Sequence, residues 1–234
     1  MARRDWDRRE LIAGIGASAC LALFAEQAGA ATGLGGAFSD ILGRATDSSL
    51  DRLAQPGAFY NDPAVRIGLP MLGGQAGGLG NVLGRALDAG QRLGLTDNLI
   101  RKLNDAAGIA AREAKPVFRN SISRLTLADV PDIARQNDGA SQYLRRSAGD
   151  ELHGKLRPLV DAGLAQVGAY RQLDAVAKQS SLIRAAGLSR DGLGRTVTEQ
   201  ALNGIFRYIG GEEARLRANP LGTAGGVLKG ILGN

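Results

Sequence analysis

Residues 59–70 are the segment of this chain most suggestive of ligand chemistry. They read FYNDPAVRIGLP, where two prolines and an Asn-Asp pair interrupt a helical pattern and apolar residues flank a single arginine. In one interpretation the segment is a structural strap: its apolar side chains enter the core, and Arg66 pairs with a helix carboxylate, such as Asp129 or Glu199, or with a carbonyl end. In the other, Arg66 and Asn61 line a polar pocket, where the guanidinium would bind anionic oxygens. We expect the structural interpretation, in which the segment is a strap.

Other residue types give little support for catalysis. His153 is the sole histidine, so a metal site there would need carboxylates for its other ligands. The sequence has no Gly-x-Ser-x-Gly motif, the turn that exposes the nucleophile of a serine triad. Carboxylate pairs such as Glu212 and Glu213 stand beside basic residues, which predicts solvated ion pairs. We therefore predict no cofactor, no metal and no catalytic residue. The alternative is a metal-independent hydrolase or lyase in which Glu199 or Asp129 acts with Arg and Tyr.

The first thirty residues predict a cleaved export signal. Arg8 and Arg9 precede a Gly/Ala-rich apolar run, which ends before the small residues at 28–30 that would flank the cleaved bond. We expect the twin-arginine route and release to the periplasm. The general secretion route, an uncleaved anchor and a lipid on Cys20 are alternatives, although the run is shorter than the roughly twenty residues of a membrane span. Residues 31–37 would form a short Gly-rich linker.

Composition narrows the choice of partner. The formal net charge is +6 and aromatic residues make up 4% of the chain. Positive charge attracts nucleic acids and anionic surfaces. Export and the lack of aromatic residues among the basic clusters argue against nucleic acid. We expect an anionic small molecule, a lipid or an envelope protein as partner, and no transmembrane span in the mature chain.

The rest of the chain predicts an all-α protein, because apolar residues recur at helical spacing and no run alternates as a strand would. Residues 38–234 should form a single domain, a bundle of about eight to ten helices with an irregular Pro-containing loop near the N-terminus. Ser147 and Thr196 stand where helices could start, and Pro158 predicts a kink or restart. The expected helices cover approximately 38–54, a segment ending near 92, 96–119, 127–135, 139–146, 148–165, 168–178, 196–217 and a short C-terminal stretch.

Five separated motifs share their residues and their order with one known family. They are FYNDPAVRIGLP at 59–70, DGASQYLRR at 138–146, KLRPLV at 155–160, TEQALNGIF at 198–206 and the stretch 213–220. In these motifs the chain resembles DUF4197, a family of exported, all-helical bacterial proteins with no assigned activity. It departs from the family pattern at Gly108, where an acidic residue is usual, and at Gly68, where proline is usual. The resemblance implies a fold and a compartment and leaves the chemistry open.

Polar residues of these motifs indicate where a ligand would bind. A protein core does not accommodate such groups without partners, so we expect a satisfied internal network or the wall of a wet cavity. The candidate ligand-binding residues are Asn61, Arg66, Asp129, Gln142, Tyr143, Arg145, Arg146 and Glu199. Clustered arginines would suit a carboxylate, a phosphate or a lipid head group. We therefore expect a non-enzymatic binding module, with an enzyme and a purely structural or interaction protein of the envelope as alternatives.

Overall fold

The computed structural model describes residues 30–69, 95–125, 136–179 and 189–218, and these residues form helices and no strand. The chain is therefore all-α, as predicted. The described helices are α2 (Ala30–Leu53), α3 (Ala58–Asn61), α5 (Leu95–Glu113), α6 (Lys115–Ser123), α8 (Gly139–Gln166), α9 (Ala169–Gln179) and α11 (Arg190–Ala218). The expected count of about eight to ten is not confirmed, since the described part of the chain holds seven. The helices expected near residue 92, at 127–135 and at the C-terminus lie outside the described residues, as does the export signal.

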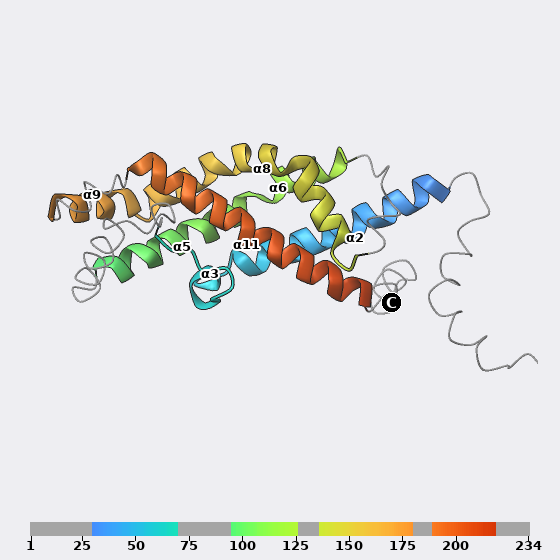
Figure 1. The fold of residues 1–234 in the computed structure, drawn as a ribbon, viewed down its shortest axis with the longest axis horizontal. Coiled ribbons are helices and arrows are strands. Elements are labelled where there is room, and N and C mark those ends of the chain that lie inside the picture. The colour runs from blue at the N-terminus through green and yellow to red at the C-terminus, as the bar shows by residue number, and fades with distance from the viewer. Residues whose placement is uncertain (1–29, 70–94, 126–135, 180–188, 219–234) are drawn as a thin grey trace, which may run out of the picture.

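The described helices form an elongated bundle (Figure 1). α11 runs along this bundle and packs against α8 and α2, while α8 packs against α5 and α6. α9 lies at the end of the bundle where α5 begins (Figure 1). Among the described residues, no helix combines the length and the apolarity that crossing a membrane requires.

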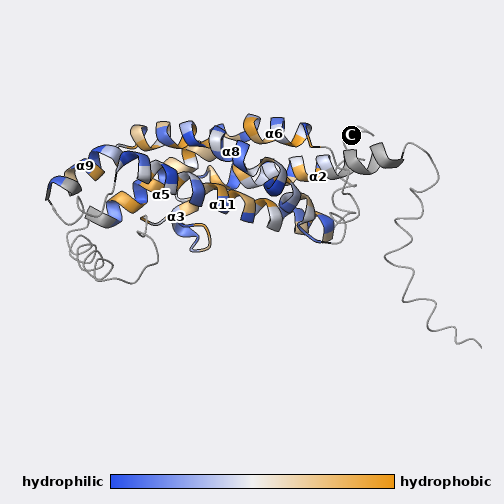
Figure 2. Cartoon of the chain, turned by 45° about the horizontal axis from the view of Figure 1, so that its top comes forward, coloured by the Kyte–Doolittle hydropathy of each residue, from blue (hydrophilic) through white to orange (hydrophobic). Residues whose placement is uncertain are grey.

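One continuous hydrophobic core joins these helices. Hydrophobic residues recur between hydrophilic ones along α8 and α11, so each long helix turns one face toward its neighbours (Figure 2). Full burial of a large apolar side chain contributes about 1.5–3 kcal/mol. The largest fully buried side chains are Phe59, Phe118, Leu42, Leu50, Leu53, Ile67, Leu103, Leu144, Leu152, Leu156 and Leu164. Phe118 also meets Phe206 edge to face, with ring centroids 6.1 Å apart.

α8 is one helix where the sequence suggested two. Its buried residues recur every four positions, from Leu144 through Ala148, Leu152, Leu156 and Val160 to Leu164. Breaking the helix at Ser147 would rotate half of this stripe away from the core, so a cap at that position is not used. Pro158 is exposed and lies on another face. Its cost of about 3 kcal/mol is smaller than the gain from keeping the whole stripe buried.

Two other helix boundaries differ from the prediction for local reasons. The expected helix over 96–119 is divided into α5 and α6, because Pro116 lies in the first turn of α6 and starts a new helix there. α11 begins at Arg190, ahead of the expected Thr196. The Ser189 hydroxyl accepts a hydrogen bond of 3.0 Å from the Gly192 N–H and so caps this start. At the N-terminal side, α2 includes residues 31–37, which we expected as a linker.

Candidate ligand-binding groove

An open groove lies between residues 62–69, the first turns of α8 and the middle of α11. We call residues 62–69, the part of the segment 59–70 that follows α3 and is described, the strap. The groove has a volume of about 590 Å³, which falls within the range of small-molecule sites. Its polar lining residues are Arg66, Asp138, Ser141, Gln142, Arg145, Gln200, Asn203 and Arg207.

Glycines on α11 shape the floor of the groove. A Cβ at Gly204 would lie 3.1 Å from the Cβ of Val65 and 3.2 Å from the Phe59 ring, so the absent side chain lets the strap lie directly on the helix. Farther along, Gly211 faces open space, and Gly210 lies close to Asp138. At Gly211, which is exposed, no side chain therefore extends into the groove.

Two carboxamides hold the strap to the helices on either side. Asn104 of α5, which is buried, accepts a bond of 2.8 Å from the Ile67 N–H and donates one of 2.9 Å to the Ile67 carbonyl. Gln200 of α11 does the same for Gly68, at 2.9 and 3.3 Å. Each side chain thus pairs with the backbone as a neighbouring strand would. These bonds satisfy strap groups that no helix or sheet would otherwise pair.

A third anchor joins the start of the strap to α11. Asp62 accepts hydrogen bonds from the Ala64 N–H, at 2.9 Å, and from the Tyr208 hydroxyl, at 2.7 Å. The Tyr208 bond, followed by the Ala64 bond, lowers the pKa of the Asp62 carboxyl. Burial and the Asp62 bond raise the pKa of the Tyr208 hydroxyl. The carboxylate is therefore ionised and the phenol protonated at neutral pH, which is the state that this anchor requires.

The arginines of the groove are oriented by aromatic rings and by neutral oxygens. The Arg66 guanidinium lies over the Tyr60 ring, 4.6 Å from its centroid, and its Nε donates to the Tyr60 carbonyl at 2.5 Å. Arg145 lies over Phe206 at 5.1 Å and donates to Asn203 Oδ1. Such stacking leaves the remaining guanidinium N–H groups of each arginine free to face a ligand.

The described residues give none of the three groove arginines, Arg66, Arg145 and Arg207, an ion pair with a carboxylate. Eight other arginines of the described chain do have carboxylate partners within 4.0 Å: Arg101, Arg119, Arg124, Arg157, Arg190, Arg195, Arg215 and Arg217. Within the groove the one carboxylate is Asp138, which accepts a bond of 2.9 Å from the Gln142 amide. Counted over its lining residues, the groove therefore holds three positive charges against one negative charge.

The first turn of α8 is held at the groove by a buried carboxylate. Glu213 of α11 is fully buried and accepts bonds from the N–H groups of Ala140, at 3.0 Å, and Ser141, at 2.8 Å. The Ser141 hydroxyl, at 2.6 Å, and Arg217, at 2.5 Å, complete its partners. The prediction that Glu212 and Glu213 are solvated is wrong for both, since Glu212 is 8% exposed. Glu213 satisfies free amides and the positive end of the helix dipole, so it acts as a cap supplied by another helix.

A second cavity of about 420 Å³ adjoins the groove. The two share Arg145 and Phe206, and the second is also lined by Gly149, Asp150, His153, Glu199 and Leu202. It brings Glu199 into a cavity with an arginine, as the enzyme alternative required, but no tyrosine lines it.

The predicted site residues divide between these places. Arg66, Gln142 and Arg145 line the groove, and Glu199 lines the second cavity. Tyr143 is half-buried against the core, and Asn61 and Arg146 are exposed and line neither cavity. Asp129 lies outside the described residues. Arg66 pairs with the carbonyl end of α3 and not with Glu199.

Several groove residues were not predicted, although the sequence held a signal for some of them. Gln200, Asn203 and Arg207 stand at i, i+3 and i+7 of α11, and therefore share one helix face with Gly204 and Gly211. A polar face interrupted by glycines is the signal that marks them. Asp138 and Ser141 belong to the motif that supplied Gln142 and Arg145.

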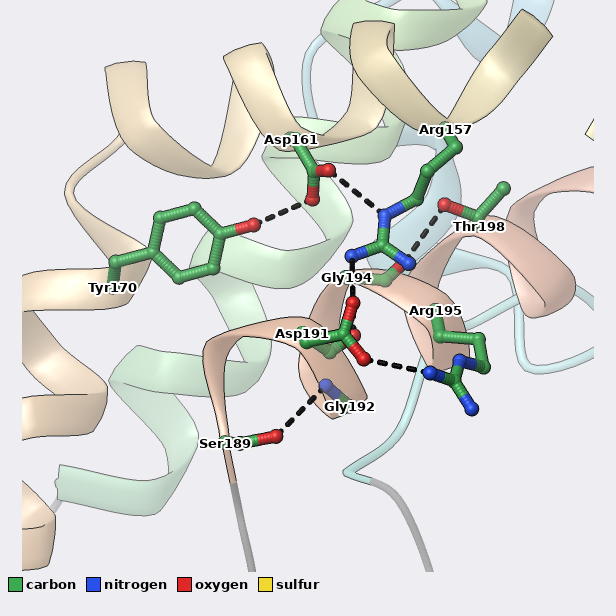
Figure 3. A network of polar contacts seen from close by, with 9 residues as sticks. All are labelled: Arg157, Asp161, Tyr170, Ser189, Asp191, Gly192, Gly194, Arg195 and Thr198. Carbon is green, nitrogen blue, oxygen red and sulfur yellow. Dashed lines mark hydrogen bonds and ion pairs between the residues drawn. The ribbon is translucent and has the colours of Figure 1, made fainter. Parts of the chain in front are cut away.

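A carboxylate, an arginine and a tyrosine do converge elsewhere, as Figure 3 shows. Asp161 accepts from Tyr170, at 2.6 Å, and from Arg157, at 2.8 Å, and Arg157 also reaches Asp191 at 3.1 Å. Burial, and then the bond to Asp161, raise the pKa of the Tyr170 hydroxyl. A Cβ at Gly194 would lie only 2.3 Å from Asp161. These side chains bond to one another in a tightly packed cluster, which joins α8, α9 and α11.

Comparisons with known proteins establish the family. A family model described as "Protein of unknown function (DUF4197)" matches residues 30–233, and the chain therefore belongs to this family. No curated protein and no solved structure matches the chain. In the described residues, no group of three or more His, Cys, Asp or Glu side chains is placed to hold a metal ion.

Proposed function

We propose that this member of the DUF4197 family is an exported protein that binds an anionic small molecule in the groove. The observation that carries this proposal is the presence of Arg66, Arg145 and Arg207 in one open groove. No ion pair within 4.0 Å joins them to a carboxylate of the described residues, and Asp138 is the one lining residue with a negative charge. Guanidinium groups bind carboxylate and phosphate oxygens in pairs of parallel hydrogen bonds, which suits them to such ligands.

The groove favours binding because much of its organisation precedes the ligand. The Tyr60 and Phe206 rings orient two of the arginines, and Asn104 and Gln200 fix the strap that carries Arg66. A ligand would therefore have to order few side chains, and each side chain that is already ordered saves about 0.5–1.5 kcal/mol of binding entropy.

Calorimetric titration of the purified chain with inorganic phosphate and with a dicarboxylate tests the proposal. We expect binding of at least one of these anions, and we expect Arg145→Gln and Arg207→Gln each to weaken it about fivefold or more. Arg44→Gln is the matched control, because Arg44 is exposed on α2 and lines neither cavity. An affinity that the Arg44 and Arg145 variants reduce equally would show general attraction to a basic protein and would contradict a built site.

Export belongs to the same proposal and has its own test. The N-terminal sequence of the protein recovered from the periplasm should begin near Ala31, because small residues at 28–30 flank the expected cleavage. Replacement of Arg8 and Arg9 by lysine should stop export if the twin-arginine route is used. A protein that retains Met1, or whose first residue is Cys20, would contradict cleavage at this position.

A further inference from the structure

The second cavity has the opposite charge character to the groove that it adjoins. Asp150 and Glu199 supply two carboxylates, and neither forms an ion pair within 4.0 Å among the described residues. Arg145, which lines both cavities, is the one cation of fixed charge there, and it is engaged by Asn203 and by the Phe206 ring. His153 is the remaining titratable group.

The arginines of the groove and the carboxylates of the second cavity indicate the charges of a ligand that would bind across both. It would be negative in the groove and positive in the second cavity. The groove has three guanidinium groups against one carboxylate, which matches a dianion better than a monoanion. A phosphate monoester carries about −1.5 to −2 charge at neutral pH, whereas a carboxylate carries one negative charge. The two carboxylates beyond Arg145 would attract a cation attached to the same molecule.

We propose that the ligand is a small zwitterion of the aminoalkyl phosphate class. Its phosphate lies against Arg66, Arg145 and Arg207, and its ammonium group lies in the second cavity near Asp150 and Glu199. This inference rests on the proposed function, because it assigns the anion to the same groove. It adds a second subsite and a class of ligand.

The shared wall supports one ligand that spans both cavities. Arg145 and Phe206 belong to the linings of both, so a short alkyl link would pass beside the Phe206 ring. An ammonium group is preferred to a hydroxyl because it adds Coulomb attraction to both carboxylates and offers three donors for their oxygens.

Titration calorimetry with phosphoethanolamine and with ethyl phosphate tests the inference. The two probes share a phosphate monoester and differ in the amine. We expect phosphoethanolamine to bind about fivefold to tenfold more tightly, the size that one or two partly exposed ion pairs supply. The double variant Asp150→Asn, Glu199→Gln should reduce this preference to less than about twofold while it still binds ethyl phosphate. Glu113→Gln, at an exposed carboxylate outside both cavities, should keep the preference.

The outcomes separate the inference from the proposed function. Equal affinities for the two probes would overturn the ammonium subsite and leave anion binding in place. A preference that persists in the double variant would also overturn it. If neither probe binds, the inference fails, and the proposed function fails with it only if inorganic phosphate and the dicarboxylate do not bind either.

Vesicles distinguish a soluble ligand from a lipid head group with the same two charges. Phosphatidylethanolamine is a diester with one negative charge, so the groove's surplus of positive charge favours the soluble monoester. The chain should therefore not sediment with phosphatidylcholine vesicles that contain phosphatidylethanolamine. The monoester assignment would be overturned if the chain sediments with these vesicles but not with pure phosphatidylcholine vesicles, and if phosphoethanolamine reverses this sedimentation.

Discussion

Replacement of Glu213 by glutamine tests whether a buried carboxylate organises the end of α8 at the groove. Both carboxylate oxygens face donors: Oε1 accepts from the Ala140 N–H and Arg217, and Oε2 accepts from the Ser141 N–H and hydroxyl. Whichever way the glutamine amide turns, its NH₂ group meets at least one backbone N–H. One buried donor then lacks an acceptor, at a cost of about 1–3 kcal/mol.

The loss of charge adds to this cost. Arg217 is only 16% exposed and would keep its charge while it loses this carboxylate. Removal of one member of a buried ion pair costs about 3–5 kcal/mol, although the glutamine oxygen recovers part of this. We therefore expect Glu213→Gln to destabilise the protein by about 3 kcal/mol, which lowers the melting temperature of a protein of this size by about 6–12 °C.

Urea unfolding followed by circular dichroism measures the difference, and Glu199→Gln provides the control. Glu199 is exposed on the same helix, so its variant should stay within about 0.5 kcal/mol of the wild type. Hydrogen exchange should also become faster at the Ala140 and Ser141 amides in the Glu213 variant. A loss of less than about 1 kcal/mol, with unchanged exchange at these amides, would refute the reasoning, because the carboxylate would then not be the acceptor that holds this turn.

Asn104→Asp should destabilise the protein by about 2–4 kcal/mol, because a carboxylate cannot donate to the two carbonyls that the Asn104 amide now serves, and urea unfolding checks this. Gly163→Ala should cost about 1–3 kcal/mol, since its Cβ would lie 2.8 Å from the Ala106 carbonyl oxygen, whereas Gly154→Ala on the same helix meets no atom within 4 Å and should be neutral or stabilising in thermal melts. Hydrogen bonds from Arg215 lower the pKa of Glu212 below its ordinary 4.5. The difference in unfolding free energy between wild type and Glu212→Gln should therefore be largest above about pH 5 and vanish as the pH falls through the lowered pKa. Urea titrations at stepped pH measure it.

The helical class could be predicted, because it depends on a sum over many residues, whereas the prediction divided the buried stripe of α8 at Ser147. The stripe from Leu144 to Leu164 repeats six times at one spacing, and no single polar residue outweighs it. Helix ends depend on competition between a few local groups. Ser147 is followed by Asp150, as an N-cap often is, yet it lies inside α8, since a break there would expose part of the stripe. The cap of α11 is Ser189, which was not predicted.

The site was only partly predictable for a related reason. Arg66 stood out because its segment mixes one charge with apolar residues, and Arg145 stood out as a polar residue of a motif shared with the family. Arg207 lies on a polar helix face that looks the same whether it meets water or a groove. Glu213 was missed because its neighbour Glu212 is chemically identical. Successive helix residues are rotated by about 100°, and only the packing of α11 against α8 decides which carboxylate meets the free amides.

The two interpretations of residues 59–70 are compatible, because successive side chains at 65–67 face the core and the groove in turn. Val65 and Ile67 are buried, and Arg66 between them is exposed at the groove. The strap therefore needs no buried ion pair for its stability, since Asn104 and Gln200 bond its backbone and leave the arginine side chain outside. A segment anchored through its backbone can present a charged side chain to solvent at little cost in folding free energy. The same alternation that fills the core thus supplies a guanidinium to the ligand site.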